Sequence, residues 1–291
     1  MNQDEILKII GSVNHPVAMG GYNSDDFDNH CQIVNLVIFD GKVHSEEILI
    51  RDSTIFKISH GNLLEHDSQI LLSYENLKIV QDEQWDLKQL LSKIQEKRDT
   101  LFASSTKNSL VESQFALSKA KNALETDDPF LSCWIKCAAI SLIDSILLQN
   151  KIIPNPIHSL SLLRNLKHEK NNQFSEKIIS EIGIERATPS LLTRMLNSSC
   201  GFTGMVGNND NAIIIEKKAN YLIENSLLSD CYLYLIYQNK NNFYKIKNSL
   251  NVNSDKIHVL KTAFDLTSHS SESDSIDSLM KITNTNLNQA Y

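Results

Sequence analysis

The fold class is indicated by residues 16–61, which read PVAMGGYNSDDFDNHCQIVNLVIFDGKVHSEEILIRDSTIFKISHG. A short apolar run meets the pair Gly20 and Gly21, and an acidic segment follows. Three runs rich in β-forming residues come next: Ile33 to Phe39, Glu47 to Ile50 and Thr54 to Ile58. Between the first two, Asp40-Gly41 is a strong turn signal. We therefore predict a small mixed α/β unit that ends near residue 82.

Two neighbouring segments in this stretch contrast in composition. Residues 33–39 are almost wholly apolar, which predicts a central strand covered on both faces. Residues 24–30 are polar and acidic, and Ser24 would cap a helix whose first turn holds acids, as the helix dipole favours. We therefore expect residues 24–30 to form a short helix or a loop before the strand.

Most of the chain after residue 82 has apolar residues at helical spacing. The clearest boundary is Asp128-Pro129, because an acid can cap a helix and proline fits its first position. The helix that follows, to about Gln149, is apolar nearly all round and is expected at the centre of its domain. The glycine-rich residues 201–210 predict a connecting loop.

The composition divides the chain into three segments. Residues 1–82 are expected to form the α/β domain, and residues 83–266 the helical domain. Residues 267–291 are expected to be a flexible tail, because residues 267–278 are serine-rich, with three acids and no base.

The totals restrict the classes of function. The 291 residues carry a formal net charge of −7, which argues against a broadly basic nucleic-acid-binding surface and leaves only a local patch open. No apolar run reaches the roughly 18 residues of a membrane span, and the acidic N-terminus is unlike a secretory signal. Five scattered cysteines fit a reduced compartment, so we expect a cytoplasmic protein without membrane contact.

The order of elements in the first 60 residues resembles the opening of the nucleotidyltransferase fold. A strand, a Gly-Gly turn, a short helix and a strand–turn–strand follow one another there. The helical segment with its central apolar helix resembles the HEPN-like domains joined to such enzymes. The resemblance implies an α+β chain, with a small nucleotidyltransferase-like unit followed by a larger all-α domain. It also implies a Gly-Ser turn for phosphates and an Asp-x-Asp pair that holds Mg²⁺.

The sequence departs from this pattern at each step. The turn is Gly20-Gly21, without the serine hydroxyl. Where Leu36 to Phe39 matches the family strand, the acid positions hold Ile33 and Asn35, and the neighbouring strand carries Lys57. Isoleucine cannot bind Mg²⁺, and asparagine offers only a neutral carbonyl. The resemblance then implies lost catalysis, with nucleotide binding retained through the turn glycines, Asn35 and Lys57.

Two alternatives stay open. A second frame contains a literal Gly11-Ser12 and a literal Asp26-Phe27-Asp28, and it would give an active Mg²⁺-dependent transferase that uses Asp26 and Asp28. In a simpler interpretation, those two acids are solvated residues at the start of a helix. The other alternative is a non-enzymatic interaction protein, whose helical domain binds a second copy or another protein.

Arg164 and His168 form a further candidate pair. HEPN-type ribonucleases carry an arginine and a histidine a few residues apart, where the histidine works as an acid or base. Only three residues separate Arg164 from His168, which is shorter than the usual spacing. A solvated, basic helix end explains the same residues, because cations suit a helix C-terminus.

Overall fold

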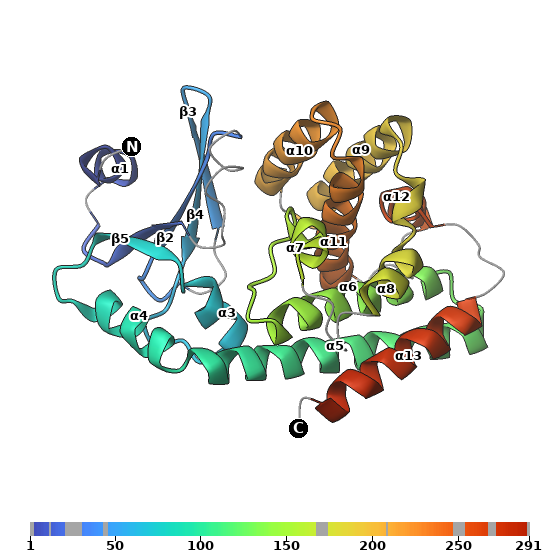
Figure 1. Ribbon diagram of the computed structural model, residues 1–291. Coiled ribbons are helices and arrows are strands. Elements are labelled where there is room, and N and C mark those ends of the chain that lie inside the picture. The colour runs from blue at the N-terminus through green and yellow to red at the C-terminus, as the bar shows by residue number, and fades with distance from the viewer. Residues whose placement is uncertain are drawn as a thin grey trace. The chain divides into compact units, whose positions relative to one another are not determined.

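The computed structural model describes residues 3–11, 13–20, 31–42, 46–166, 174–207, 209–246, 254–266 and 272–289 (Figure 1). It forms two compact units, Met1–Ser104 and Ser105–Tyr291, and the division falls within helix α5, Arg98–Thr126. The first unit holds a five-stranded mixed sheet with short helices, and the second is all helical. The predicted α+β class is therefore confirmed. The domain limits 1–82 and 83–266 stay predictions.

The sheet of the first unit has the order β3-β4-β2-β1-β5. Its strands are β1 (Val17–Gly20), β2 (Ile33–Ile38), β3 (Glu46–Arg51), β4 (Thr54–His60) and β5 (Leu77–Gln81). Strands β2 and β4 are parallel, and the other neighbouring pairs are antiparallel. The apolar run at residues 33–39 is thus a central strand, as predicted. Residues 24–30 lie outside the described residues.

Helix α1 (Gln3–Ile10) covers one face of this sheet. Its Ile6 is buried in a cluster with residues from four strands: Val17, Leu36, Ile38, Phe56, Ile58 and Val80. Since alternate strand residues point to opposite faces, the residues between these positions belong to the other face. Asn35 and Lys57 are among them, so the apolar packing under α1 leaves the two polar residues together on the opposite side.

Two more helices complete the first unit, α3 (Ser68–Ser73) and α4 (Asp86–Glu96). Asp67 caps α3, because its Oδ1 accepts hydrogen bonds from the backbone N–H groups of Gln69 and Ile70 at 2.8 and 3.1 Å. Figure 1 shows α3 across the sheet from α1, and α4 at the end of the sheet.

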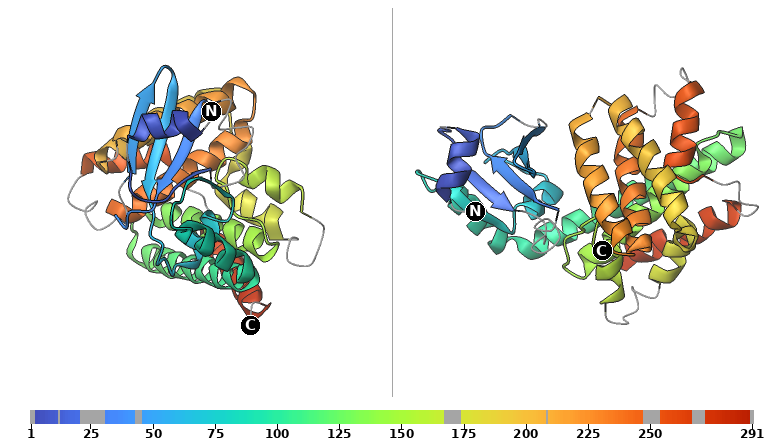
Figure 2. Two further views of the ribbon diagram at one scale, coloured as in Figure 1. Left: turned by 90° about the vertical axis from the view of Figure 1, so that its left-hand side faces the viewer. Right: turned by 90° about the horizontal axis from the view of Figure 1, so that it is seen from above.

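The second unit is built from helices that pack around two central helices, α6 and α9. They are α6 (Leu131–Gln149), α7 (Ser159–Arg164), α8 (Ser175–Ile182), the 3-10 turn η2 (Ile184–Arg186), α9 (Pro189–Met205), α10 (Asn209–Glu224), α11 (Leu228–Ile246), α12 (Ser254–Ala263) and α13 (Glu272–Gln289), together with most of α5. Helices α10, α11 and α12 all pack on α9, while α7, α8, α11 and α13 pack on α6 (Figure 2).

The predictions for two segments of this unit were wrong. Residues 201–205, expected in a loop, continue α9, and the chain turns only afterwards, at Gly207 with φ +82°. Residues 272–289, expected in a flexible tail, form α13, which buries Ile276, Leu279 and Ile282. Serines and acids dominate residues 267–278, but this apolar stripe at helical spacing starts near their end and supplies the packing energy.

Helix α6 is the central helix, as predicted, although it starts three residues later than Asp128. The Asp128 carboxylate accepts a hydrogen bond from the backbone N–H of Phe130 at 2.9 Å. Almost every residue of α6 is buried, including Cys133 and Cys137. Among the described helices, α6 alone is long and apolar enough to span a membrane, but 89% of its apolar stretch is buried inside the protein. That burial is typical of a core helix, which passes the same test.

We predict that Ala139→Asp severely destabilises the second unit. Ala139 is fully buried in α6, and an unpaired carboxylate there would lose its water, at a cost of about 3 kcal/mol or more. The measurement is the thermal midpoint of unfolding. Ala103→Asp is the matched control, because Ala103 is an exposed position of α5. Equal midpoints for the two variants would show that α6 is not packed as described.

We also predict that Gly61→Ala destabilises the first unit by about 1–3 kcal/mol. A Cβ at Gly61 would lie 3.0 Å from the Phe39 ring and 3.0 Å from the Tyr74 hydroxyl. These two rings pack edge to face at 5.1 Å, so neither is free to move aside. Gly201→Ala, in α9, meets nothing within 4 Å and should stabilise by about 0.5–1 kcal/mol. Urea unfolding measures both changes, and a neutral Gly61→Ala would contradict the close packing.

Candidate functional site

The sheet places three of the predicted binding residues next to one another. Asn35 on β2 pairs with Lys57 on β4 in the parallel register. On the other side of β2, Met19 of β1 pairs with Leu36, so Gly20 comes next to the Asn35 position. We call Gly20, Asn35 and Lys57 the polar row. Gly21 lies outside the described residues, as do Asp26 and Asp28.

Gly20 needs its lack of a side chain. Its φ of +102° lies in the region that L residues rarely adopt, and an added Cβ would be 3.5 Å from the Asn76 carbonyl oxygen. The end of β1 therefore has a conformation that favours glycine, and no Cβ stands between a ligand and the Gly20 backbone.

The Lys57 ammonium already has an anionic neighbour. Its Nζ lies 3.0 Å from Oε1 of Glu46 on β3, and the two side chains are 26% and 43% exposed. An ion pair this exposed is worth about 1 kcal/mol or less. The polar row therefore offers one amide, one partly neutralised cation and bare backbone.

The polar row does not fit Mg²⁺. The position two residues before Asn35 is Ile33, which is buried and has no donor atom, and an ammonium at Lys57 repels a divalent cation. Across the described residues, no group of three His, Cys, Asp or Glu side chains is placed to hold a metal ion. The second frame with Asp26 and Asp28 falls outside that search.

An aspartate–histidine pair lies where β2 and β4 end, and sequence reasoning missed it. His60 Nδ1 is 2.9 and 3.0 Å from the two carboxylate oxygens of Asp40, and both side chains are more than nine-tenths buried. His60 Nε2 faces Glu47, whose Oε1 is 3.9 Å away. The available signal was that each residue follows an apolar run, but only parallel pairing of those runs brings their ends together.

The charge of Asp40 is stabilised by its neighbours. Burial acts to raise the pKa of this carboxyl, but hydrogen bonds from the Lys42 backbone, the His60 ring and the Lys42 ammonium outweigh that effect and hold the pKa below its ordinary value. Lys42 Nζ is 3.3 Å from Asp40 Oδ2 and its side chain is 71% exposed. The Asp40 carboxylate therefore orients the His60 ring through its contacts with Nδ1.

The structure connects Arg164 to a different partner from the one expected. Arg164 Nη1 at the end of α7 lies 3.9 Å from Oδ2 of Asp230 on α11. Burial raises the pKa of Asp230, while Arg164 and His158 act to lower it. His168 lies outside the described residues, so its pairing with Arg164 stays a prediction.

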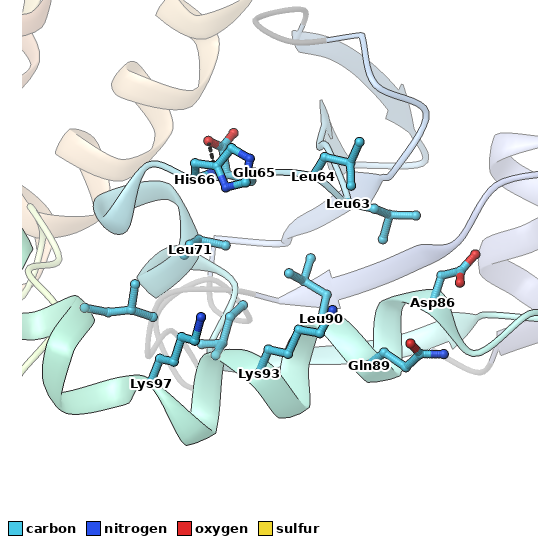
Figure 3. Close-up of a pocket in the computed structure, with 12 residues that line it drawn as sticks. Leu63, Leu64, Glu65, His66, Leu71, Asp86, Gln89, Leu90, Lys93 and Lys97 are labelled. Atoms are coloured by element: carbon cyan, nitrogen blue, oxygen red, sulfur yellow. Dashed lines mark hydrogen bonds between the residues drawn. The ribbon is translucent and has the colours of Figure 1, made fainter.

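A pocket of about 750 Å³ opens in the first unit, away from the polar row (Figure 3). It is lined by Leu63, Leu64, Glu65, His66, Leu71, Asp86, Gln89, Leu90, Lys93, Ile94, Lys97 and Leu101. These residues come from the loop after β4, from α3 and from α4 with the start of α5. Its volume is in the range of small-molecule sites.

We predict that Asp40→Asn destabilises the protein by about 1–3 kcal/mol at pH 7, because it weakens charge-assisted hydrogen bonds of a buried carboxylate. A carboxyl whose pKa is lowered by folding contributes stability above its unfolded value, near 3.8, and loses it as pH falls through the folded pKa. The difference between variant and wild type should therefore shrink below pH 3.8. Urea unfolding at pH 7 and at pH 3 measures it, with Lys78→Gln at an exposed position of β5 as control. A pH-independent difference would contradict an ionised Asp40.

Comparison with known proteins gives one distant structural similarity. No protein-family model and no curated protein sequence matches the chain. The crystal structure of a nucleotidyltransferase-like protein from Exiguobacterium sibiricum 255-15, at 1.90 Å resolution, is similar over 87% of this chain and 88% of that chain. The identity is 8% and the TM-score 0.36. A similarity this distant identifies neither a ligand nor an activity.

Proposed function

We propose that the first unit binds a nucleotide at the polar row and does not transfer it by Mg²⁺-dependent chemistry. The observation that carries the proposal is the register that aligns Asn35 with Lys57 beside the bare end of β1. An amide and an ammonium would meet a phosphate as donors. Gly20 has no side chain that would keep a phosphate away from its backbone, which is what close approach at a phosphate-binding turn requires.

Binding at this row is a competition between two anions for one cation. A phosphate that reaches Lys57 must displace Glu46 from the 3.0 Å ion pair. Because that pair is partly exposed, its loss costs little, whereas a charge-assisted hydrogen bond to phosphate is among the stronger polar contacts. Glu46 therefore limits the affinity without preventing binding.

Mg²⁺-dependent transfer needs carboxylates that hold the metal ion, and the polar row contains no carboxylate. A triphosphate carries several negative charges, and the family chemistry neutralises them with a metal ion held by carboxylates. In the frame that the family resemblance implies, Ile33 and Asn35 take the positions of those carboxylates, and Lys57, which pairs with Asn35 in the sheet, adds a positive charge. Lys57 would offset some of the phosphate charge, which supports binding without turnover.

The test is a titration of the purified protein with each of the four NTPs, followed by a transfer assay with Mg²⁺ or Mn²⁺. We expect binding without product. Lys57→Gln should weaken binding by about 10-fold, and Glu46→Gln should tighten it by a few-fold, since each changes one partner of the same ion pair. Lys78→Gln is the control, because Lys78 is an exposed lysine on β5.

Each other outcome supports a different function. Product formation that disappears in Asp26→Asn or Asp28→Asn would show that the second frame is right and that the protein is an active transferase. Absence of both binding and transfer would favour the interaction protein, which then requires a partner for the helical unit. Equal affinities of Lys57→Gln and Glu46→Gln would place any nucleotide away from the polar row.

A further inference from the structure

Five apolar side chains line the pocket of Figure 3, and we call them the leucine wall. They are Leu63 from the loop after β4, Leu71 from α3, Leu90 and Ile94 from α4, and Leu101 from α5. Leu64 lies at the same pocket with 76% of its surface exposed. A leucine left this exposed beside a cavity of about 750 Å³ adds apolar surface that a ligand could cover.

Two lysines line the pocket on the α4 side. Lys93 and Lys97 are four residues apart, so they share one face of the helix. Figure 3 shows both side chains rising from the ribbon into the region of the pocket. Like charges at this spacing repel each other, which mildly destabilises the helix. No ion pair from the described residues reaches either ammonium, so this repulsion is not offset.

The preference of cations for a helix C-terminus explains why lysines lie near the end of α4, but it does not explain why they line the pocket. Cations are favoured near a helix C-terminus, and Lys93 lies in the last turn of α4. That effect would be the same if the lysines pointed away from the cavity. Their place beside five apolar side chains is what requires a further reason.

The acids of the pocket do not neutralise the lysines. Glu65 Oε1 accepts hydrogen bonds from the backbone N–H groups of His66 and Asp67, each at 2.8 Å, so this carboxylate is held by its own loop. Asp86 lies in the first turn of α4, where an acid suits the helix dipole. Asp86 and Lys93 are separated by a rise of about 10 Å along the helix. The pocket thus has a cationic end and an anionic end.

We propose that this pocket binds a small amphipathic anion. A carboxylate, phosphate or sulfonate head would lie on Lys93 and Lys97, and a hydrocarbon or aromatic body would lie on the leucine wall. The head would relieve the repulsion between the lysines, and the body would cover the exposed surface of Leu64. The pocket shares no residue with the polar row, so this proposal stands or falls independently of nucleotide binding.

The experiment compares three probes of equal chain length by calorimetric titration of the full-length protein. The probes are decanoate, decanol and decyltrimethylammonium, which share a ten-carbon chain and carry an anionic, a neutral and a cationic head. Decanoate should bind one site per chain, about 10-fold tighter than decanol, and decyltrimethylammonium should bind weakest. The order of the three affinities reports the sign of the charge at the site.

Variants then separate the head contact from the body contact. The double variant Lys93→Gln/Lys97→Gln should reduce decanoate affinity to that of decanol and leave decanol binding unchanged. Leu64→Ser should weaken both probes by a similar factor. Lys88→Gln is the matched control, because Lys88 is on the same helix but lies over the Trp85 ring, 4.1 Å from its centroid. All these positions are exposed, so the fold is retained, and thermal unfolding checks that.

Three results would overturn the proposal. One is the absence of saturable decanoate binding. Another is equal affinity for decanoate and decyltrimethylammonium, which would mean that the lysines do not contact the head. The third is unchanged decanoate affinity in the double lysine variant, which would place the binding elsewhere on the protein.

Discussion

The packing of the second unit depends on one buried ammonium group. Lys136 lies in the middle of α6 and donates hydrogen bonds to the Tyr232 hydroxyl at 2.9 Å and to the carbonyl oxygens of Phe264 and Asp265 at 2.8 and 3.3 Å. The Tyr232 hydroxyl in turn donates to the Asp265 carboxylate, which also accepts from Arg186. Burial lowers the pKa of Lys136 to about 8 despite the nearby Asp265 charge. A buried cation is tolerated only when its partners are all in place, so this group fixes how α6, α11 and the end of α12 meet.

A second polar cluster on α6 is less completely satisfied. Lys240 Nζ binds Glu112 at 3.1 Å and the Ser141 hydroxyl at 2.9 Å. Asp144 lies close to this cluster, and its Oδ1 has no hydrogen-bond partner among the described residues. Burial raises the pKa of Asp144 to about 7, against the lowering effect of Lys240. One helix therefore carries both a cation held by its partners and a carboxyl whose neutral form is stabilised by burial.

The sequence was informative where a single segment determines its own environment. The apolar run at residues 33–39 has to be a covered strand, and the apolar helix after Asp128 has to be central, because neither could leave its surface in water. Reasoning failed where composition concealed periodicity, as in α13, whose serines and acids precede the apolar stripe. It also failed for Asp40 and His60, which are 20 residues apart and meet only because β2 and β4 are parallel. Pairing of this kind depends on the whole sheet, and no local pattern specifies it.

The two candidate sites of the first unit differ in the groups that lie beside their lysines. Lys57 points from the sheet face opposite α1 and is held by Glu46, so an anion binds there only by displacing a carboxylate. Lys93 and Lys97 have no such competitor among the described residues, and the pocket that they line is also lined by leucine and isoleucine side chains. We proposed a nucleotide for the first environment because Gly20 has no side chain and the Asn35 amide is next to Lys57 in the sheet. An amphipathic anion suits the second, since only a ligand with apolar surface gains from the leucine wall. The two proposals thus give the same ammonium group different ligands, according to whether a carboxylate or a hydrocarbon surface lies beside it.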